Sequence, residues 1–280
     1  MAKGKHSIEK APKHDGAKKP SKRRRIIQIV CIVIIVGCLI ALGIIIYSYL
    51  HQQKYYEDLA DVAIVEPTDD LADMTVDWDS LRATNPDIVA WIKVPDTVID
   101  YPVVQASDNE TYLHRSFDGS SGITSSAGCI FADYTNSPDF TDKLTGLYGH
   151  HMNDGSMFAA FADFADQEQF DAHRTVYILT PTMNYKLTTF SVVLTNGSDL
   201  IVQTSFADDA AFTSYIEDKL SRSVVSQPAT ESIAAADVKQ AFLFSTCEYS
   251  QTDGRAVVFA AVTQSAVPKN AATQATQAAN

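Results

Sequence analysis

The chain has 280 residues, a formal net charge of −12 and a sequence pI near 4.9. The charge is divided unevenly, because the first 25 residues hold ten of the 22 lysines and arginines but only two of the 34 acidic residues. The remainder therefore carries a net charge of −20, and a domain of that charge repels phosphate. Composition argues against nucleic acid as a partner and suggests a basic tail and an acidic domain in different compartments.

An uncharged apolar run extends from residue 26 to residue 50. It is long enough to cross a bilayer core, which takes roughly 20 apolar residues of helix. A cleaved signal peptide is the alternative, but its apolar region is usually about 7–15 residues and precedes a small-residue cleavage site. The following HQQKYYEDLADVAIVEP has no such site. Because basic residues flanking a span stay inside the cell, we predict a cytoplasmic tail over 1–25, a single membrane span over 26–50 and an extracellular remainder.

The extracellular part is predicted to contain a polar, partly helical stalk over 51–79, a main domain over 80–264 and a disordered tail over 265–280. Short β-rich runs recur through the main domain, at 88–94, 98–105, 128–134, 143–150, 175–180, 185–195, 240–247 and 255–263. Many short strands without regular helices between them predict a mainly β fold, either a barrel or a sandwich. Two added helices are predicted over 156–170, with Ser156 as N-cap, and over 208–223.

Only two of the four cysteines, Cys129 and Cys247, lie outside the predicted span. They either form one disulfide or leave at least one thiol for another task. Cys247 ends an apolar β-rich run, and Arg255 opens the next run after a short polar loop. A hairpin of this length brings Arg255 alongside Cys247, and the two-residue period of a strand places Ser245 on the same face. The alternative interpretation is a buried structural cysteine beside an unrelated surface arginine, which would give the same sequence pattern.

A pair of histidines at the end of another predicted strand supplies a candidate base. His150 and His151 directly follow Gly149, which permits a sharp exit from the strand. A free cysteine thiol has a pKa of about 8.5, so a nucleophilic thiolate needs an imidazole or a cation nearby. Adjacent histidines also occur in zinc sites, but neither CxxC nor HExxH is present, and we predict no metal.

The segments YGHHMNDGSMF and FSTCEYS, with an arginine eight residues after the cysteine, together resemble class B sortases. NPDIVAWIKV, IDYPVVQ and DNETYLHRSF resemble further parts of that family, so the likeness covers residues 80–263. It implies a sortase-type closed β-barrel behind an N-terminal transmembrane helix, with the 208–223 helix inserted before the strand that bears the cysteine. It also implies a cysteine transpeptidase on the outer face of a Gram-positive membrane, without a cofactor.

Class B sortases cleave a sorting signal, typically Asn-Pro-x-Thr-x, near the C-terminus of a secreted protein and pass the acyl group to an amine, usually of a peptidoglycan precursor. By this resemblance Cys247 forms the thioacyl enzyme, His150 is the acid and base, and Arg255 supports the oxyanion. His151 stays an alternative to His150. The resemblance places four residues in the substrate groove: Asn109, Leu113, Ser245 and Glu248. Cys129 departs from the small residue usual in the family, and we expect a buried thiol there, since a disulfide to Cys247 would block catalysis.

Three other functions compete with this one. A pilin-polymerising sortase, which joins a protein to a pilin lysine, usually has a C-terminal span that the AATQATQAAN ending does not offer, and Asp77-Trp78 is only a faint hint of its lid. An L,D-transpeptidase also uses cysteine and histidine, but its Ser-x-Gly-Cys-x-Arg signature is absent around Cys247. A non-catalytic adhesin built on the same barrel is disfavoured by the intact cysteine, histidine and arginine.

Overall fold

The computed structural model describes residues 22–63, 70–122, 125, 127–197, 199, 202–248, 253–269 and 271, with the backbone alone at positions 62, 63 and 248. The chain divides into two compact units, Met1–Ile46 and Tyr47–Asn280. The sheet, the shorter helices and the pocket described below all belong to the second unit.

A single continuous helix, α1 (Lys22–Ala63), contains the apolar run. Among the described residues it is the one helix long and apolar enough to cross a membrane. Its large apolar side chains between Ile26 and Ile46 are exposed, which is costly in water but suits a helix surrounded by lipid. The helix therefore fits the membrane anchor expected over 26–50.

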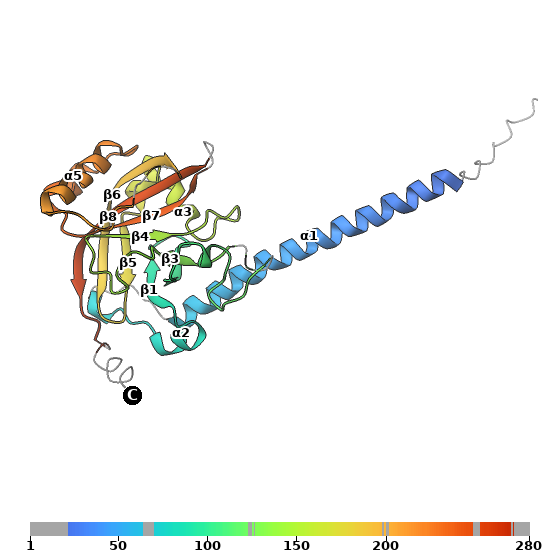
Figure 1. The fold of residues 1–280 in the computed structure, drawn as a ribbon, viewed down its shortest axis with the longest axis horizontal. Helices are drawn as coiled ribbons and strands as arrows, with labels where there is room; N and C mark the ends of the chain where they lie inside the picture. Colours follow the sequence, from blue (N-terminus) through green and yellow to red (C-terminus); the bar gives the residue numbers. More distant parts are fainter. Residues whose placement is uncertain are drawn as a thin grey trace, which may run out of the picture. The chain divides into compact units, whose positions relative to one another are not determined.

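Within the described part of the chain, eight strands close into one barrel (Figure 1). They are β1 (Ile88–Lys93), β2 (Asp100–Val104), β3 (Ile130–Ala132), β4 (Leu144–Tyr148), β5 (Thr175–Leu179), β6 (Asn184–Asn196), β7 (Ala241–Glu248) and β8 (Gly254–Ala266). Their order is β1-β2-β3-β4-β7-β8-β6-β5, with β2–β3 and β4–β7 parallel. Each predicted strand is present, and the closed barrel is confirmed over the sandwich.

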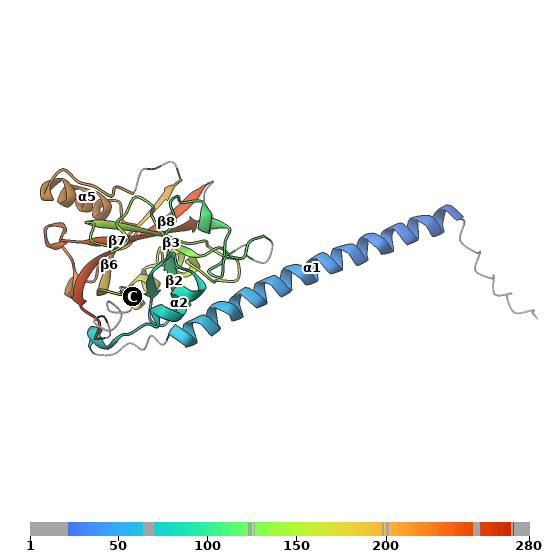
Figure 2. The same cartoon turned by 60° about the horizontal axis from the view of Figure 1, so that its bottom comes forward.

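The two predicted helices have different outcomes. The second is confirmed as α5 (Asp209–Ser221), whose N-cap Asp208 accepts a hydrogen bond from the backbone of Ala211. The first is wrong as one helix, because the structure has two short helices there, α3 (Ala159–Asp163) and α4 (Gln167–Ala172). A further helix, α2 (Trp78–Thr84), precedes the barrel, and Figures 1 and 2 show α2 and α5 on opposite sides of it.

Ser156 is not the N-cap that the sequence predicted. Met157 has a φ of +58° and forms an isolated bridge with His151, and the backbone of Phe158 donates to the carbonyl of His150 at 2.9 Å. These contacts hold residues 157 and 158 in the loop that follows β4, so the helix α3 begins only after Phe158. The hydroxyl of Ser156 instead donates to Asp154 at 2.6 Å.

Two hydrophobic clusters lie on opposite faces of β7. Phe242 and Phe244 belong to the main core, whereas Leu243 belongs to a second cluster with Phe212 and Ile216 of α5. Because successive side chains of a strand point to opposite faces, α5 covers the face to which Leu243 points. Ser245 and Cys247 share that face, beyond the part that α5 covers, and they are only half-buried.

Residues predicted as a stalk contribute to the core of the second unit. Tyr56, Leu71, Met74 and Trp78 are all buried there. The division of the chain at residue 80 stays a prediction, but side chains on both sides of it pack together. At the other end, β8 continues to Ala266, two residues into the predicted tail, and positions 270 and 272–280 of that tail lie outside the described residues.

Cys129 is the buried thiol that the sequence predicted. It is a free cysteine, and its Sγ donates to the carbonyl of Pro102 at 3.8 Å. Burial raises the pKa of this thiol to about 12, so it stays protonated at neutral pH. The thiol is thus inert where it lies, and no disulfide to Cys247 forms.

We expect Tyr56→Phe to destabilise the second unit by about 1–3 kcal/mol. The Tyr56 hydroxyl donates to the carbonyl of Gly128 at 2.8 Å and accepts from the backbone of Phe117 at 3.3 Å, so its loss leaves two buried backbone groups without this partner. Urea unfolding of the full chain in detergent micelles, followed by tryptophan fluorescence, measures the change. Tyr47→Phe, on an exposed side chain of the same helix, is the control; equal midpoints for both variants would contradict the packing of this segment.

Candidate active site

The register of four adjacent strands brings the predicted site residues to one level of the sheet. Cys247 of β7 pairs directly with Arg255 of β8, and Arg255 pairs with Thr195 of β6. On the other side of β7, Tyr148 of β4 pairs with Ser245, the backbone of Gly149 donates to the carbonyl of Ser245 at 3.2 Å, and His150 is the next residue. Directly paired residues share a face. The prediction that the hairpin brings Arg255 alongside Cys247 is confirmed.

The side chains at this level line one pocket of about 530 Å³, within the size range of small-molecule and peptide sites. Six of the seven predicted site residues line it: Cys247, His150, Arg255, Asn109, Leu113 and Ser245. The seventh, Glu248, ends β7, and its side chain lies outside the described residues. Thr195, Asn196, Gly197, Asp199 and Val202 form another part of the wall.

His150 is held by contacts on both sides of its ring. Its Nε2 lies 2.7 Å from the carbonyl oxygen of Leu113, and its ring stacks on His114 with centroids 6.0 Å apart. A carbonyl oxygen only accepts hydrogen bonds, so Nε2 carries a proton. In the neutral ring the basic nitrogen is then Nδ1. The contact with Leu113 thus selects one tautomer and one orientation of the imidazole.

His151 has a different environment. Its Nδ1 lies 2.9 Å from the backbone carbonyl of Cys247, so this nitrogen donates and the ring supports the backbone beside the thiol. His151 is not among the residues that line the pocket, which favours His150 as the imidazole nearest a bound substrate. In the part of the chain that the structure describes, no cluster of three or more His, Cys, Asp or Glu is placed to hold a metal ion.

Arg255 is anchored by its own hairpin. Its Nη1 forms an ion pair with Asp253 Oδ1 at 3.0 Å and donates to the carbonyls of Gly254 at 3.0 Å and Asp253 at 3.3 Å. Each of these contacts with a described residue uses Nη1 alone. Among the described residues the guanidinium is thus held through this one nitrogen, and its other N–H groups have no partner there.

A carboxylate that the sequence reasoning missed organises the Asn109 side of the pocket. Asp133 Oδ2 accepts from the Asn109 amide at 3.0 Å and from the Tyr148 hydroxyl at 2.8 Å. Burial alone would raise the pKa of Asp133, but hydrogen bonds from Thr135, Tyr148 and Asn109 outweigh it and lower the pKa. Asp133 lies near the end of the predicted run 128–134, as His150 lies at the end of 143–150, so polar residues at strand ends were the available signal.

No family model matches the chain, but individual proteins do. Sortase B of Listeria monocytogenes is 31% identical over 234 residues, which cover 79% of this chain and 92% of that protein. Sortase B of Staphylococcus aureus is 30% identical over 239 residues, which cover 81% of this chain and 95% of that protein.

Solved structures give the same result. Sortase B from Bacillus anthracis in complex with AAEK1 is similar with a TM-score of 0.66 and 33% identity, covering 78% of this chain and 98% of that one. The Staphylococcus aureus sortase B–substrate complex has a TM-score of 0.60 and 31% identity, covering 66% and 84%. Sequence identity over most of the chain and a shared barrel agree: this chain belongs to the sortase B family of cysteine transpeptidases.

Proposed function

We propose that this transpeptidase cleaves an Asn-Pro-x-Thr-x-like sorting signal through a thioacyl enzyme on Cys247 and transfers the cleaved protein to an amine of a peptidoglycan precursor. The observation that carries the proposal is the register of β4, β7 and β8, which sets His150, Cys247 and Arg255 in one pocket. Structures of related sortases with a substrate and with triglycine support a peptide substrate and an amine acceptor.

The first half of the reaction forms the thioacyl enzyme. Nδ1 of His150 takes the proton of the Cys247 thiol, and the thiolate attacks the carbonyl carbon of the signal's threonine. The guanidinium of Arg255 then donates a hydrogen bond to the oxyanion, an interaction worth about 3 kcal/mol for a well-placed donor. His150 gives the Nδ1 proton to the leaving amine as the carbon–nitrogen bond breaks.

The second half reverses these roles. The acceptor amine attacks the thioester carbonyl, and the neutral His150 takes a proton from that amine at Nδ1. Collapse of the intermediate forms the new amide and releases Cys247 as a thiolate. Nε2 of His150 donates to the Leu113 carbonyl in both charge states, so one proton moves and the ring need not turn.

The location of the domain follows from the anchor. Ten basic residues precede the apolar run, and positive flanking residues stay in the cytoplasm, so we place the catalytic domain outside the cell. There it meets secreted proteins and the cell-wall precursor, which are the two partners that the reaction needs.

Cleavage of quenched Asn-Pro-x-Thr-x peptides by the full chain in detergent micelles tests the function. We expect cleavage by the wild type and none by Cys247→Ala, while Cys129→Ala, at the buried thiol, keeps most activity. Added triglycine should give a transpeptidation product, detected by mass spectrometry. Equal cleavage by Cys247→Ala would overturn the mechanism, and transfer to a lysine side chain in preference to triglycine would point to a pilin acceptor instead.

The two histidines can be separated by parallel substitutions. We expect His150→Asn to lower kcat by about 10²–10⁴-fold, the range for loss of a general acid and base. His151→Asn should lower it by no more than about tenfold, because an asparagine amide still offers a donor to the Cys247 carbonyl. Steady-state peptide cleavage measures both, and the reverse order of losses would make His151 the catalytic imidazole.

Asp133→Asn should raise KM for the peptide by about three- to tenfold and leave kcat nearly unchanged, because Asn109 and Tyr148 lose a shared acceptor worth about 1 kcal/mol to each donor. Asp139→Asn is a matched control, since Asp139 is an exposed carboxylate outside the pocket. The folded-state pKa of Asp133 is lowered, so its stabilising effect is complete above the ordinary pKa of about 3.9 and is lost as the pH falls through the lowered value. A kcat loss without a KM change would argue against this positioning.

A further inference from the structure

A carboxylate in the wall of the Cys247 pocket is hydrogen-bonded to the strand partner of Arg255. Asp199 lines the pocket, and its Oδ2 accepts a hydrogen bond of 2.7 Å from the hydroxyl of Thr195. Thr195 pairs directly with Arg255, so their side chains share a face. A carboxylate beside a guanidinium is a natural partner for a charge-assisted hydrogen bond.

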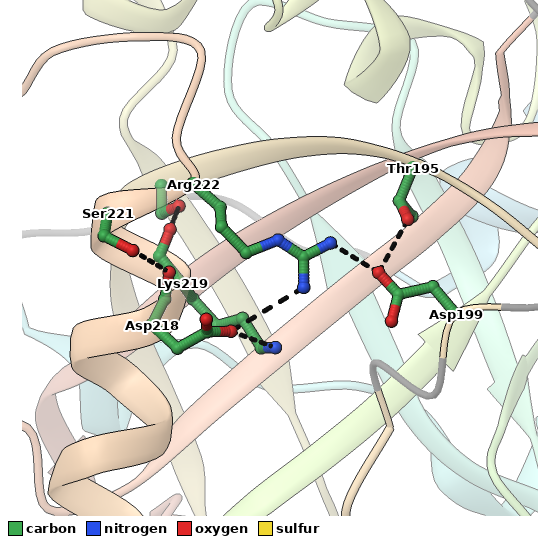
Figure 3. Close-up of polar contacts among 7 residues, drawn as sticks. Thr195, Asp199, Asp218, Lys219, Ser221 and Arg222 are labelled. Atoms are coloured by element: carbon green, nitrogen blue, oxygen red, sulfur yellow. Dashed lines mark hydrogen bonds and ion pairs between the residues drawn. The ribbon is translucent and has the colours of Figure 1, made fainter.

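The carboxylate of Asp199 is instead bound by a different arginine (Figure 3). Arg222, the C-cap of α5, directs Nη2 to Asp199 Oδ2 as both a hydrogen bond and an ion pair. Hydrogen bonds from Arg222 and then from Thr195 lower the pKa of Asp199. Asp199 is therefore charged at neutral pH, and its charge faces Arg222.

The end of α5 that carries Arg222 is firmly attached to the barrel. The hydroxyl of Ser191 on β6 donates to the carbonyl of Lys219 at 2.7 Å, and the buried Lys219 ammonium bonds Asp218 at 2.7 Å and lies 4.5 Å from the centre of the Tyr215 ring. Nη1 of Arg222 lies 3.6 Å from the same Asp218 carboxylate (Figure 3). These contacts hold the Arg222 guanidinium at a defined place beside the pocket wall.

We propose that Arg222 is a positioning residue of the transpeptidase site, which binds Asp199 and thereby prevents this carboxylate from pairing with Arg255. The inference rests on the role proposed above for Arg255. Asp253 pairs with Nη1 of Arg255, so a second carboxylate would compete with the oxyanion for the other N–H groups of the guanidinium. It would also offset the positive charge that Arg255 presents to the sulfur and the oxyanion.

Loss and rescue of peptide cleavage test the proposal in the full chain in detergent micelles. We expect Arg222→Gln to lower kcat/KM by about tenfold, a fraction of the 10²–10³-fold that a whole oxyanion donor is worth. Adding Asp199→Asn to Arg222→Gln should restore kcat/KM to the level of Asp199→Asn alone, because the competing carboxylate is gone. Lys143→Gln, which removes the Lys143–Asp209 ion pair at the other end of α5, is the control and should change kcat/KM by less than about twofold.

The reactivity of Cys247 gives a second readout that a merely structural role of Arg222 does not move. The pH profile of its alkylation by iodoacetamide, followed by peptide mapping, should shift to higher pH in Arg222→Gln and return in the double variant. If Arg222→Gln is too unstable to purify, Arg222→Lys should show a smaller shift in the same direction. A double variant no more active and no more reactive than Arg222→Gln would overturn the proposal. If wild type cleaves no Asn-Pro-x-Thr-x peptide, the proposed function fails, whereas the alkylation profiles still decide the role of Arg222.

Discussion

The backbone ladder through β4, β7, β8 and β6 is the constraint on which the site depends. It fixes Cys247 opposite Arg255 and Arg255 opposite Thr195, and it continues through Gly149 toward His150. A shift of one residue in this register would turn Cys247 into the barrel core. Because the ladder is built from many hydrogen bonds and buried apolar side chains, the barrel itself holds the residues proposed to react.

The helix α5 covers only part of the outer face of these strands, and the uncovered part forms the pocket. Phe212 and Ile216 cover one part, where Leu243 and its neighbours are buried. The strand ends beyond α5 keep the same face open, so Ser245 and Cys247 line a pocket. The last turn of α5 also carries Arg222, which joins the covering helix to the pocket wall through Asp199. One helix thus buries a hydrophobic face and supplies a charge at its edge.

Charge control is demanding in this domain because acidic residues greatly outnumber basic ones. The guanidinium of Arg255 acts as a positive charge beside Cys247 only if neighbouring carboxylates are bound by other groups. Asp133 is satisfied by Asn109, Tyr148 and Thr135, and Asp199 by Thr195 and Arg222. Asp199 therefore lies in the pocket wall bound by Arg222, Asp133 is hydrogen-bonded to a residue of that wall, and among the described residues the carboxylate that pairs with Arg255 is Asp253.

The sequence by itself determined the strands, α5, the anchor helix as a candidate span and the facing of Cys247 and Arg255, because alternation, capping and a short hairpin are local properties. Local pattern was misleading at 156–170, where the pairing of Met157 with His151 delays the first helix until after Phe158 and two short helices replace the predicted one. Only the tertiary structure showed that the two adjacent histidines have different partners. His150 contacts the carbonyl of Leu113, and His151 contacts the carbonyl of Cys247. The tertiary structure alone brought Asp199 to Arg222 and Asn109 to Asp133. Those contacts join segments more than 20 residues apart, and no periodicity along a chain encodes which distant side chains a closed barrel brings together.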